Sequence, residues 1–241
     1  MKKLLFFLLA AASLTACKKN NVDAPGGPSP SDGVFKIKTK ASGADLTTYN
    51  YDGQGRVVSR DNGDGSKWQY EYAPGVVNVK LFNSAGVFQY GYKYELNADG
   101  LCARITVNNN PNYEILTLFN PDKTVAKRIN HINGNTSSND YFYSKGNLDS
   151  TRFNGSNGDW ESTIVNTYYA DQPNVLLYES VGETFYGKNK KNMRKSEVYK
   201  YPDGSSASQS DFSYEYDAQG RVIKETCIFG NNIGITLFTY Y

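Results

Sequence analysis

The chain has 241 residues, with 26 lysines and arginines against 24 acids, and its mean hydropathy is −0.58. A nearly neutral chain lacks the strong positive field on which nucleic-acid binding depends, so nucleic acid is excluded as an expected partner. The length allows one β-rich domain with its own core, and no apolar run reaches the about 20 residues that a membrane-spanning helix requires.

The first residues have the order of a secretory signal peptide. Lys2 and Lys3 precede a short apolar run over residues 4–12, and small residues lead into Cys17. A cysteine at the cleavage point resembles the lipobox of bacterial lipoproteins. The resemblance implies that residues 1–16 are removed and that Cys17 carries a diacylglyceryl thioether, which anchors the protein to the outer membrane on its periplasmic or its surface side. The alternative is an ordinary signal peptide followed by an incidental cysteine.

Residues 17–33 are expected to form a flexible tether behind the lipidated cysteine. Three prolines lie among Gly, Ser and Asp in this stretch, which offers little apolar surface to bury. The folded domain is therefore expected over residues 34–241. Because the leader contains two lysines and no acid, its removal leaves 24 charges of each sign.

The domain alternates between turn residues and runs typical of strands. Clusters of Gly, Asn, Asp and Ser recur at short intervals, and the runs between them, of about 6 to 11 residues, are rich in Tyr, Val, Ile, Thr and Phe. Aromatic and polar residues alternate within several runs, which predicts strands with one buried face. The alternating sets are Trp68, Tyr70 and Tyr72; Phe88, Tyr90, Tyr92, Tyr94 and Leu96; and Phe212, Tyr214 and Tyr216. Residues 188–195, rich in lysine and asparagine, are expected to form an exposed loop.

Short links between consecutive runs predict antiparallel neighbours and hence a β-meander. Counting the turns gives about 15 to 17 strands, more than an open twisted sheet usually holds. We expect an all-β fold in which an antiparallel meander of repeated hairpins rolls into a barrel-like sheet, because closure removes exposed edges. Two packed layers and an elongated β-structure are the alternatives. The aromatic stripe is expected to face the interior, and the charged residues between the aromatics are expected to face water.

Two segments near the ends of the domain nearly match. Residues 49–58 and 214–223 share the pattern Tyr-x-Tyr-Asp-x-x-Gly-Arg-Val. The tyrosines would finish a strand on its buried face, the aspartate would cap the turn, the glycine would take the left-handed position, and Arg-Val would begin the return strand. These repeat-turn residues are Tyr49, Tyr51, Asp52, Gly55 and Arg56, and then Tyr214, Tyr216, Asp217, Gly220 and Arg221.

This pattern resembles the YD repeat of Rhs-type proteins, and weaker copies between the two segments indicate internal repetition of hairpins. A tethered lipoprotein built from such hairpins also resembles uncharacterised Bacteroidetes lipoproteins described as having a porin-like β-fold. That resemblance covers nearly all of residues 34–241. It implies a porin-like fold and an envelope location, and it supplies neither an activity nor site residues.

The sequence carries no signature of catalysis. It has one histidine, His131, and lacks a nucleophile elbow, a zinc motif, a phosphate loop and a Cys-x-x-Cys pair. We therefore expect no catalytic residue, no metal and no cofactor. Residues 61–65 superficially resemble a calcium loop, but a hairpin turn explains the same Asp, Asn and Gly residues. Cys102 and Cys227 are either a disulfide of an oxidising compartment or two separate thiols.

The aromatic residues form the candidate ligand surface. Flat aromatic faces with polar tips stack on sugar rings or peptides, although they also suit the packing of a thin β-structure. The candidate stacking residues are Trp68, Tyr70, Tyr90 and Tyr92. We expect a lipid-anchored, non-catalytic binding or structural module, whose partners are the membrane and a glycan, a peptide or an envelope protein. The alternatives are an envelope glycan hydrolase and an integral outer-membrane barrel, for which residues 235–241 alternate suitably.

Overall fold

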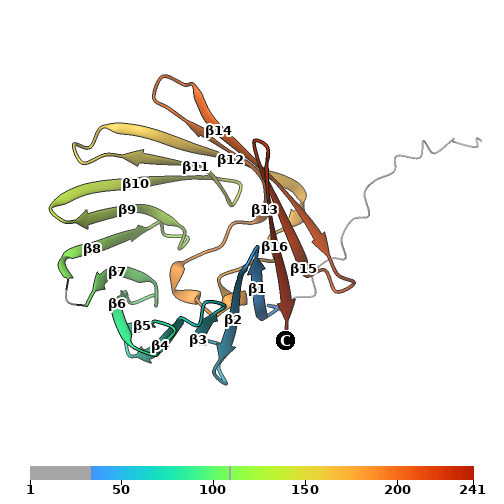
Figure 1. Ribbon diagram of the computed structural model, residues 1–241. Coiled ribbons are helices and arrows are strands. Elements are labelled where there is room, and N and C mark those ends of the chain that lie inside the picture. The colour runs from blue at the N-terminus through green and yellow to red at the C-terminus, as the bar shows by residue number, and fades with distance from the viewer. Residues whose placement is uncertain (1–33, 109) are drawn as a thin grey trace, which may run out of the picture.

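The computed structural model describes residues 34–108 and 110–241, which form one closed antiparallel barrel of 16 strands (Figure 1). Each strand pairs with the next along the chain, and the last strand pairs with the first to close the sheet. The expectation of an all-β meander that rolls shut is confirmed, with a strand number inside the expected range. The signal peptide, the lipidation site Cys17 and the tether lie outside the described residues.

The strands differ in length, and most are joined by short turns. They are β1 (Ile37–Ser42), β2 (Asp45–Tyr51), β3 (Val57–Asn62), β4 (Lys67–Ala73), β5 (Val76–Phe82), β6 (Phe88–Leu96), β7 (Cys102–Val107), β8 (Asn110–Phe119), β9 (Val125–Ile132), β10 (Asn135–Ser144), β11 (Asn147–Asn154), β12 (Trp160–Pro173), β13 (Asn192–Lys200), β14 (Ser206–Tyr216), β15 (Val222–Phe229) and β16 (Asn232–Tyr240). Two short 3₁₀ helices, η1 (Glu179–Val181) and η2 (Thr184–Tyr186), lie between β12 and β13. In the described part of the chain, no helix has the length and apolar character needed to cross a membrane.

The turn after β2 shows how the recurrent Asx and Gly residues form hairpins. The backbone N–H of Asp52 donates to the carbonyl of Arg56 at 2.9 Å, and the N–H of Gly55 donates to the carbonyl of Asp52 at 2.9 Å. The Asp52 carboxylate accepts further bonds from the Arg56 backbone and guanidinium at 2.9 and 2.8 Å. Gly55 has a φ of 74°, where a Cβ is poorly tolerated. The turn after β14 has the same bonds, made by Asp217, Gly220 and Arg221.

A β-bulge beside this turn turns two side chains of β3 inward. Tyr51 pairs with Val57, whereas Asn50 pairs with Ser59, so one extra residue lies on β3. Val57 is completely buried, and Arg60 lies on the same interior face opposite Tyr49. The second copy has the same register, which places Val222 and Glu225 inside. The two copies therefore contribute charges of opposite sign to the barrel interior.

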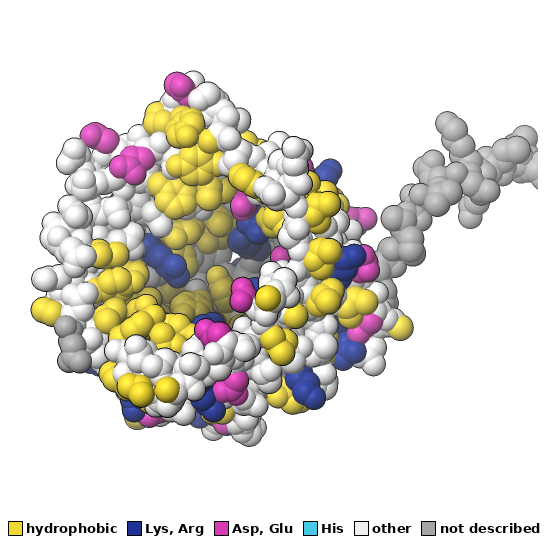
Figure 2. Space-filling model, in the orientation of Figure 1, with side chains coloured by type: hydrophobic (Ala, Val, Ile, Leu, Met, Phe, Trp, Pro, Cys, Tyr) yellow, Lys and Arg dark blue, Asp and Glu magenta, His cyan; other side chains and the backbone are white. Residues whose placement is uncertain are grey.

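The two faces of the wall differ in chemistry. On β4 the aromatic residues point inward, and Tyr70 is 7% exposed. The charged residues that alternate with them point outward and pair with charges on neighbouring strands. Outer ion pairs between neighbouring strands are Lys67–Asp61, Lys80–Glu71, Arg104–Glu114, Lys127–Asp140 and Lys224–Glu215, and Lys93–Glu95 lies within β6. Figure 2 shows the result from one side, a hollow body whose cavity is lined mainly by hydrophobic side chains with a few charges among them.

Two sequence-based expectations were wrong. Phe88 does not share a face with Tyr90, because a bulge pairs Tyr90 with Leu81 but Phe88 with Phe82, the next residue of β5. Residues 188–195 are not an exposed loop. Their second half begins β13, where Met193 is 2% exposed, since pairing with β12 orders this lysine-rich stretch.

The longest connection, residues 174–191, folds into the barrel and does not leave it as a surface loop (Figure 1). Its carbonyl at Gly182 accepts the N–H of Val57 at 3.4 Å. Its N–H groups at Lys188 and Lys191 donate to the carbonyls of Lys123 and Gly146, both at 2.9 Å. These contacts fasten it to turns at the end where β1 begins and β16 finishes, and Phe185 and Ser180 are buried within it. We call this segment the inner loop.

Candidate functional site

One cavity in the barrel interior is lined by aromatic rings and has a volume of about 270 Å³. Trp68 and Tyr70 from β4, Tyr92 and Tyr94 from β6, and Tyr113 from β8 form much of its wall. The inner loop closes it with Glu183 and Tyr186, and β3 contributes Arg60. We call it the aromatic cavity.

The aromatic rings of this cavity are held in fixed mutual geometry. Trp68 stacks on Tyr92 with ring centroids 6.0 Å apart and an interplanar angle of 13°. Tyr92 in turn stacks on Tyr94 at 6.1 Å and 19°. Tyr90 meets the edge of both Trp68 and Tyr92, at 84° and 87°. Rings locked in this way lose little conformational entropy when a ligand binds.

A half-buried carboxylate and a half-buried guanidinium lie beside these rings. The hydroxyl of Tyr70 donates to Glu183 Oε1 at 2.7 Å. Burial raises the pKa of Glu183, against the opposing effects of that hydrogen bond and of Arg60. The Arg60 guanidinium lies 5.1 Å from the Trp68 ring centroid, and its buried Nε has no hydrogen-bond partner among the described residues. The cavity therefore offers an acceptor, a donor and stacking faces together.

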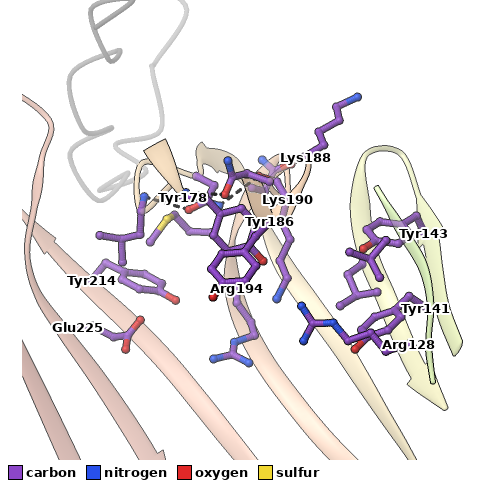
Figure 3. Close-up of a pocket in the computed structure, with 17 residues that line it drawn as sticks. Arg128, Tyr141, Tyr143, Tyr178, Tyr186, Lys188, Lys190, Arg194, Tyr214 and Glu225 are labelled. Carbon is purple, nitrogen blue, oxygen red and sulfur yellow. Dashed lines mark hydrogen bonds between the residues drawn. The ribbon is translucent and has the colours of Figure 1, made fainter. Parts of the chain in front are cut away.

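A second cavity, of about 380 Å³, has Tyr186 in common with the aromatic cavity, and Figure 3 shows its lining. Arg128 from β9, Lys188 and Lys190 from the inner loop and Arg194 from β13 bring four positive charges to its lining. Within the described lining, the one carboxylate is that of Glu225 on β15. Tyrosines complete much of the wall, namely Tyr141, Tyr143, Tyr178 and Tyr214. We call it the basic cavity.

Among the described residues, two of the four cations in the basic cavity have an acidic partner within ion-pair distance, and Arg128 and Lys190 have none. Arg194 pairs with Glu197 and lies 3.9 Å from the ring centroid of Phe212. Lys188 is 3.9 Å from Asp122. Burial, together with the neighbouring charge of Arg194, lowers the pKa of Lys190 to about 8.

The sequence-predicted stacking residues are brought together in part. Trp68, Tyr70 and Tyr92 line the aromatic cavity, and Tyr90 lies against its edge. Most repeat-turn residues instead stabilise the strands and turns of the barrel wall. The Tyr51 hydroxyl, for example, donates to the carbonyl of Ile37 at 2.6 Å. The other residues of this group are Tyr49, Asp52, Gly55, Arg56, Tyr216, Asp217, Gly220 and Arg221. Tyr214 is the repeat residue that lines the basic cavity.

Sequence reasoning missed the charged residues of both cavities. Arg60 and Glu225 occupy equivalent positions of the two repeat copies, three residues after Val57 and Val222. The match between the copies could therefore have predicted that both side chains lie on the same face of the wall. Arg128 and Lys190 had no such signal, because one lies in a strand that resembles its neighbours and the other in the stretch interpreted as an exposed loop.

The remaining candidates lie away from the cavities or serve the turns. His131 is on the outer face, where its Nδ1 is 2.9 Å from the hydroxyl of Thr136. Asp61 pairs with Lys67 at 3.1 Å, as part of an ordinary hairpin. Over the described ranges, no cluster of three or more metal-ligating side chains occurs. Cys102 and Cys227 are free thiols on β7 and β15.

No family model and no curated protein matches the chain. Among solved structures, it resembles a porin-like protein from Bacteroides uniformis with a TM-score of 0.60 and 15% identity, over 87% of this chain and 98% of that one. It also resembles a porin-like protein from Bacteroides vulgatus with a TM-score of 0.61 and 10% identity, over 86% and 99%. The fold is porin-like. At these identities the likeness extends to the fold alone, and the YD-repeat resemblance stays a prediction.

Proposed function

We propose that this protein is a lipid-anchored protein of the bacterial outer membrane whose barrel binds a glycan in its interior without catalysing a reaction. The observation that carries the binding role is the aromatic cavity, where stacked Trp68 and Tyr92 lie beside half-buried Arg60 and Glu183. Sugar rings present an apolar face for stacking and hydroxyls for charged hydrogen-bond partners, so the cavity has the complement of both. The lipid anchor rests on the signal peptide and Cys17.

The outer face favours a barrel held in water over one embedded in lipid. A membrane barrel needs an apolar band of about 25 Å around its whole circumference. Here ion pairs lie on the outer wall along β3 to β10 and again on β14 and β15. Exposed apolar side chains gather mainly on one side, on β2, β15 and β16, as Leu46, Ile228, Ile233, Ile235 and Leu237. Figure 2 shows charged side chains on the outside of the visible face.

Expression of residues 34–241 in buffer tests this placement. A monodisperse monomer that melts cooperatively without detergent supports the proposal. Aggregation that only detergent relieves would favour the integral barrel. The anchor is tested separately, because Cys17→Ser should abolish incorporation of a fatty-acid analogue. Undiminished label on that variant would end the lipoprotein interpretation.

A glycan hydrolase is the alternative activity. Its acid and base would need two carboxyl groups facing one substrate. The aromatic cavity has Glu183 alone in its lining, and the basic cavity has Glu225 alone. Binding is therefore the better-supported function of these two cavities.

The glycan site has a built-in reporter. The chain has two tryptophans, of which Trp68 lines the aromatic cavity and Trp160 is 43% exposed on the outside. In the Trp160→Phe chain, tryptophan emission should therefore shift saturably when a bound neutral oligosaccharide stacks on Trp68. Adding Tyr92→Leu should weaken the affinity about fivefold, since an aromatic pair contributes on the order of 1 kcal/mol.

Phe142→Leu is the matched control for this titration, because Phe142 is a 44% exposed aromatic outside the cavity. It should leave the affinity unchanged. The glycan proposal fails if a panel of bacterial and host oligosaccharides produces no saturable change, or if Phe142→Leu and Tyr92→Leu weaken binding equally.

A further inference from the structure

We propose that the basic cavity is a binding site for a small organic anion, a sugar-sized molecule that carries a carboxylate or sulfate group. This inference goes beyond the glycan role of the aromatic cavity. The two cavities have only Tyr186 in common among their lining residues. Binding of a ligand in one cavity therefore does not depend on binding in the other.

The charge balance of the cavity is incomplete. Arg194 is compensated by Glu197, and Lys188 approaches Asp122 at its outer end. Arg128 and Lys190 have no ion-pair partner among the described residues, and the buried Nε of Arg128 lacks a hydrogen-bond partner there as well. A buried cation without a partner is destabilising, and a bound anion would offset that cost.

Three cations, the unpaired Arg128 and Lys190 and the Glu197-paired Arg194, converge on the cavity from different elements. Arg128 comes from β9, Lys190 from the inner loop and Arg194 from β13, and Figure 3 shows their charged ends directed into the same space. Three fixed positions around one space suit a carboxylate or sulfate, because guanidinium groups bind such planar or tetrahedral oxyanions with two parallel hydrogen bonds.

Burial contributes to the same preference. Lys190 lies among Arg194, Glu197 and the tyrosines of the wall, and its pKa is lowered to about 8 by burial first and by Arg194 second. The negative charge of an anion in the cavity would oppose both effects and hold Lys190 in its charged form.

The rest of the wall indicates what carries the anionic group. Leu148, Met193 and the tyrosine rings present apolar faces, which an inorganic ion does not need. Glu225 lies beside Tyr214, across the cavity from Arg128 in Figure 3, where it can accept hydrogen bonds from hydroxyls. A volume of about 380 Å³ falls in the range of small-molecule sites. A carboxylated sugar matches all three features.

Calorimetric titration of the full chain tests the inference, in a non-ionic detergent whose head group contains no sugar. Glucuronate, glucose and sodium sulfate are the probes, at pH 7. Glucuronate should bind saturably at one site, at least tenfold more tightly than glucose, which has the same ring without the carboxylate. Sulfate should compete with it more weakly, because it has no body to fill the cavity.

Arg128→Gln and Lys190→Gln should each weaken glucuronate binding at least tenfold. Lys67→Gln, which removes a lysine from the outer face, should not. Lys190 lies on the inner loop and not in a strand, so its variant keeps the barrel wall intact even if Arg128→Gln fails to fold. Equal affinity of the wild type and Lys190→Gln, equal affinity for glucuronate and glucose, or no saturable binding would overturn the proposal. Since this readout is independent of Trp68 emission, failure here is distinguishable from failure of the glycan proposal.

Discussion

Gly182 is the residue of the inner loop that packs against the barrel wall beside Val57, and replacing it with alanine should weaken that packing. It follows η1, is buried, and has a φ of 73°. A Cβ built on Gly182 would lie 2.5 Å from the backbone nitrogen of Val57 and 3.0 Å from the carbonyl oxygen of Gly55. Both are backbone atoms of the wall, so neither can rotate away. Gly204, in the turn after β13, has a φ of 85° and no atom within 4 Å of its Cβ position.

The two glycines separate backbone strain from collision. An alanine with positive φ costs about 1–2 kcal/mol at either site. At Gly182 the collision adds the cost of an overpacked contact, about 1–3 kcal/mol. We therefore expect Gly204→Ala to lower the free energy of unfolding by about 1–2 kcal/mol and Gly182→Ala to lower it by about 2–5 kcal/mol, summing the same two terms.

Urea titrations of both variants measure the difference, and limited proteolysis within residues 174–191 shows whether the inner loop has moved. Gly182→Ala should be cleaved there faster than Gly204→Ala. If the two variants lose the same free energy and are cleaved at the same rate, the inner loop is not packed against the turn after β2, and the arrangement of both cavities would need revision.

Three further predictions concern single residues. Burial lowers the pKa of Lys190 from 10.5 to about 8. Between these two pH values the unfolded chain keeps the Lys190 proton and the folded chain has lost it. The contribution of Lys190 to the free energy of unfolding therefore rises with pH over this range. Lys190→Met should then stabilise the protein at pH 7 by up to about 3 kcal/mol, and a gain in denaturant titrations that persists at pH 10 would contradict this. In the native Cys17→Ser chain, iodoacetamide should modify half-buried Cys227 before Cys102, whose pKa burial raises to about 11, and peptide mass spectrometry would reveal the opposite order. Gly220→Val should cost more than about 1 kcal/mol at a φ of 77°, and an unchanged melting temperature would refute the assigned turn.

The wall of the barrel was predictable from sequence because its determinants are local. Trp68, Tyr70 and Tyr72 alternate with polar residues, and alternation specifies both a strand and its buried face. Turn residues specify hairpins in the same local way. Short turns between consecutive strands predicted the meander, and the number of strands predicted that the sheet closes. Alternation failed at Phe88, where a bulge inserts one residue that no local pattern marks.

The contents of the barrel were not predictable, because they depend on contacts between distant residues. Tyr70 and Glu183 are 113 positions apart and meet through the inner loop. That loop has neither strand nor helix periodicity, and Phe185 is buried in it only because the wall surrounds it. Lys190 lies in a polar stretch that resembles an exposed loop until the interior around it is known.

The strand pair that closes the barrel also determines the order in which the protein can be completed. β1 pairs with β16, and Ile37 lies opposite Tyr240. β1 is synthesised before the other strands and β16 after them, so the edge of β1 that pairs with β16 stays unpaired until the other strands have been made. Contacts between residues so far apart in sequence form slowly. Loss of only the last 9 residues of strand, β16, would leave edges open on both β1 and β15. Loss of this one strand would therefore convert the closed barrel into an open sheet with two unpaired, aggregation-prone edges.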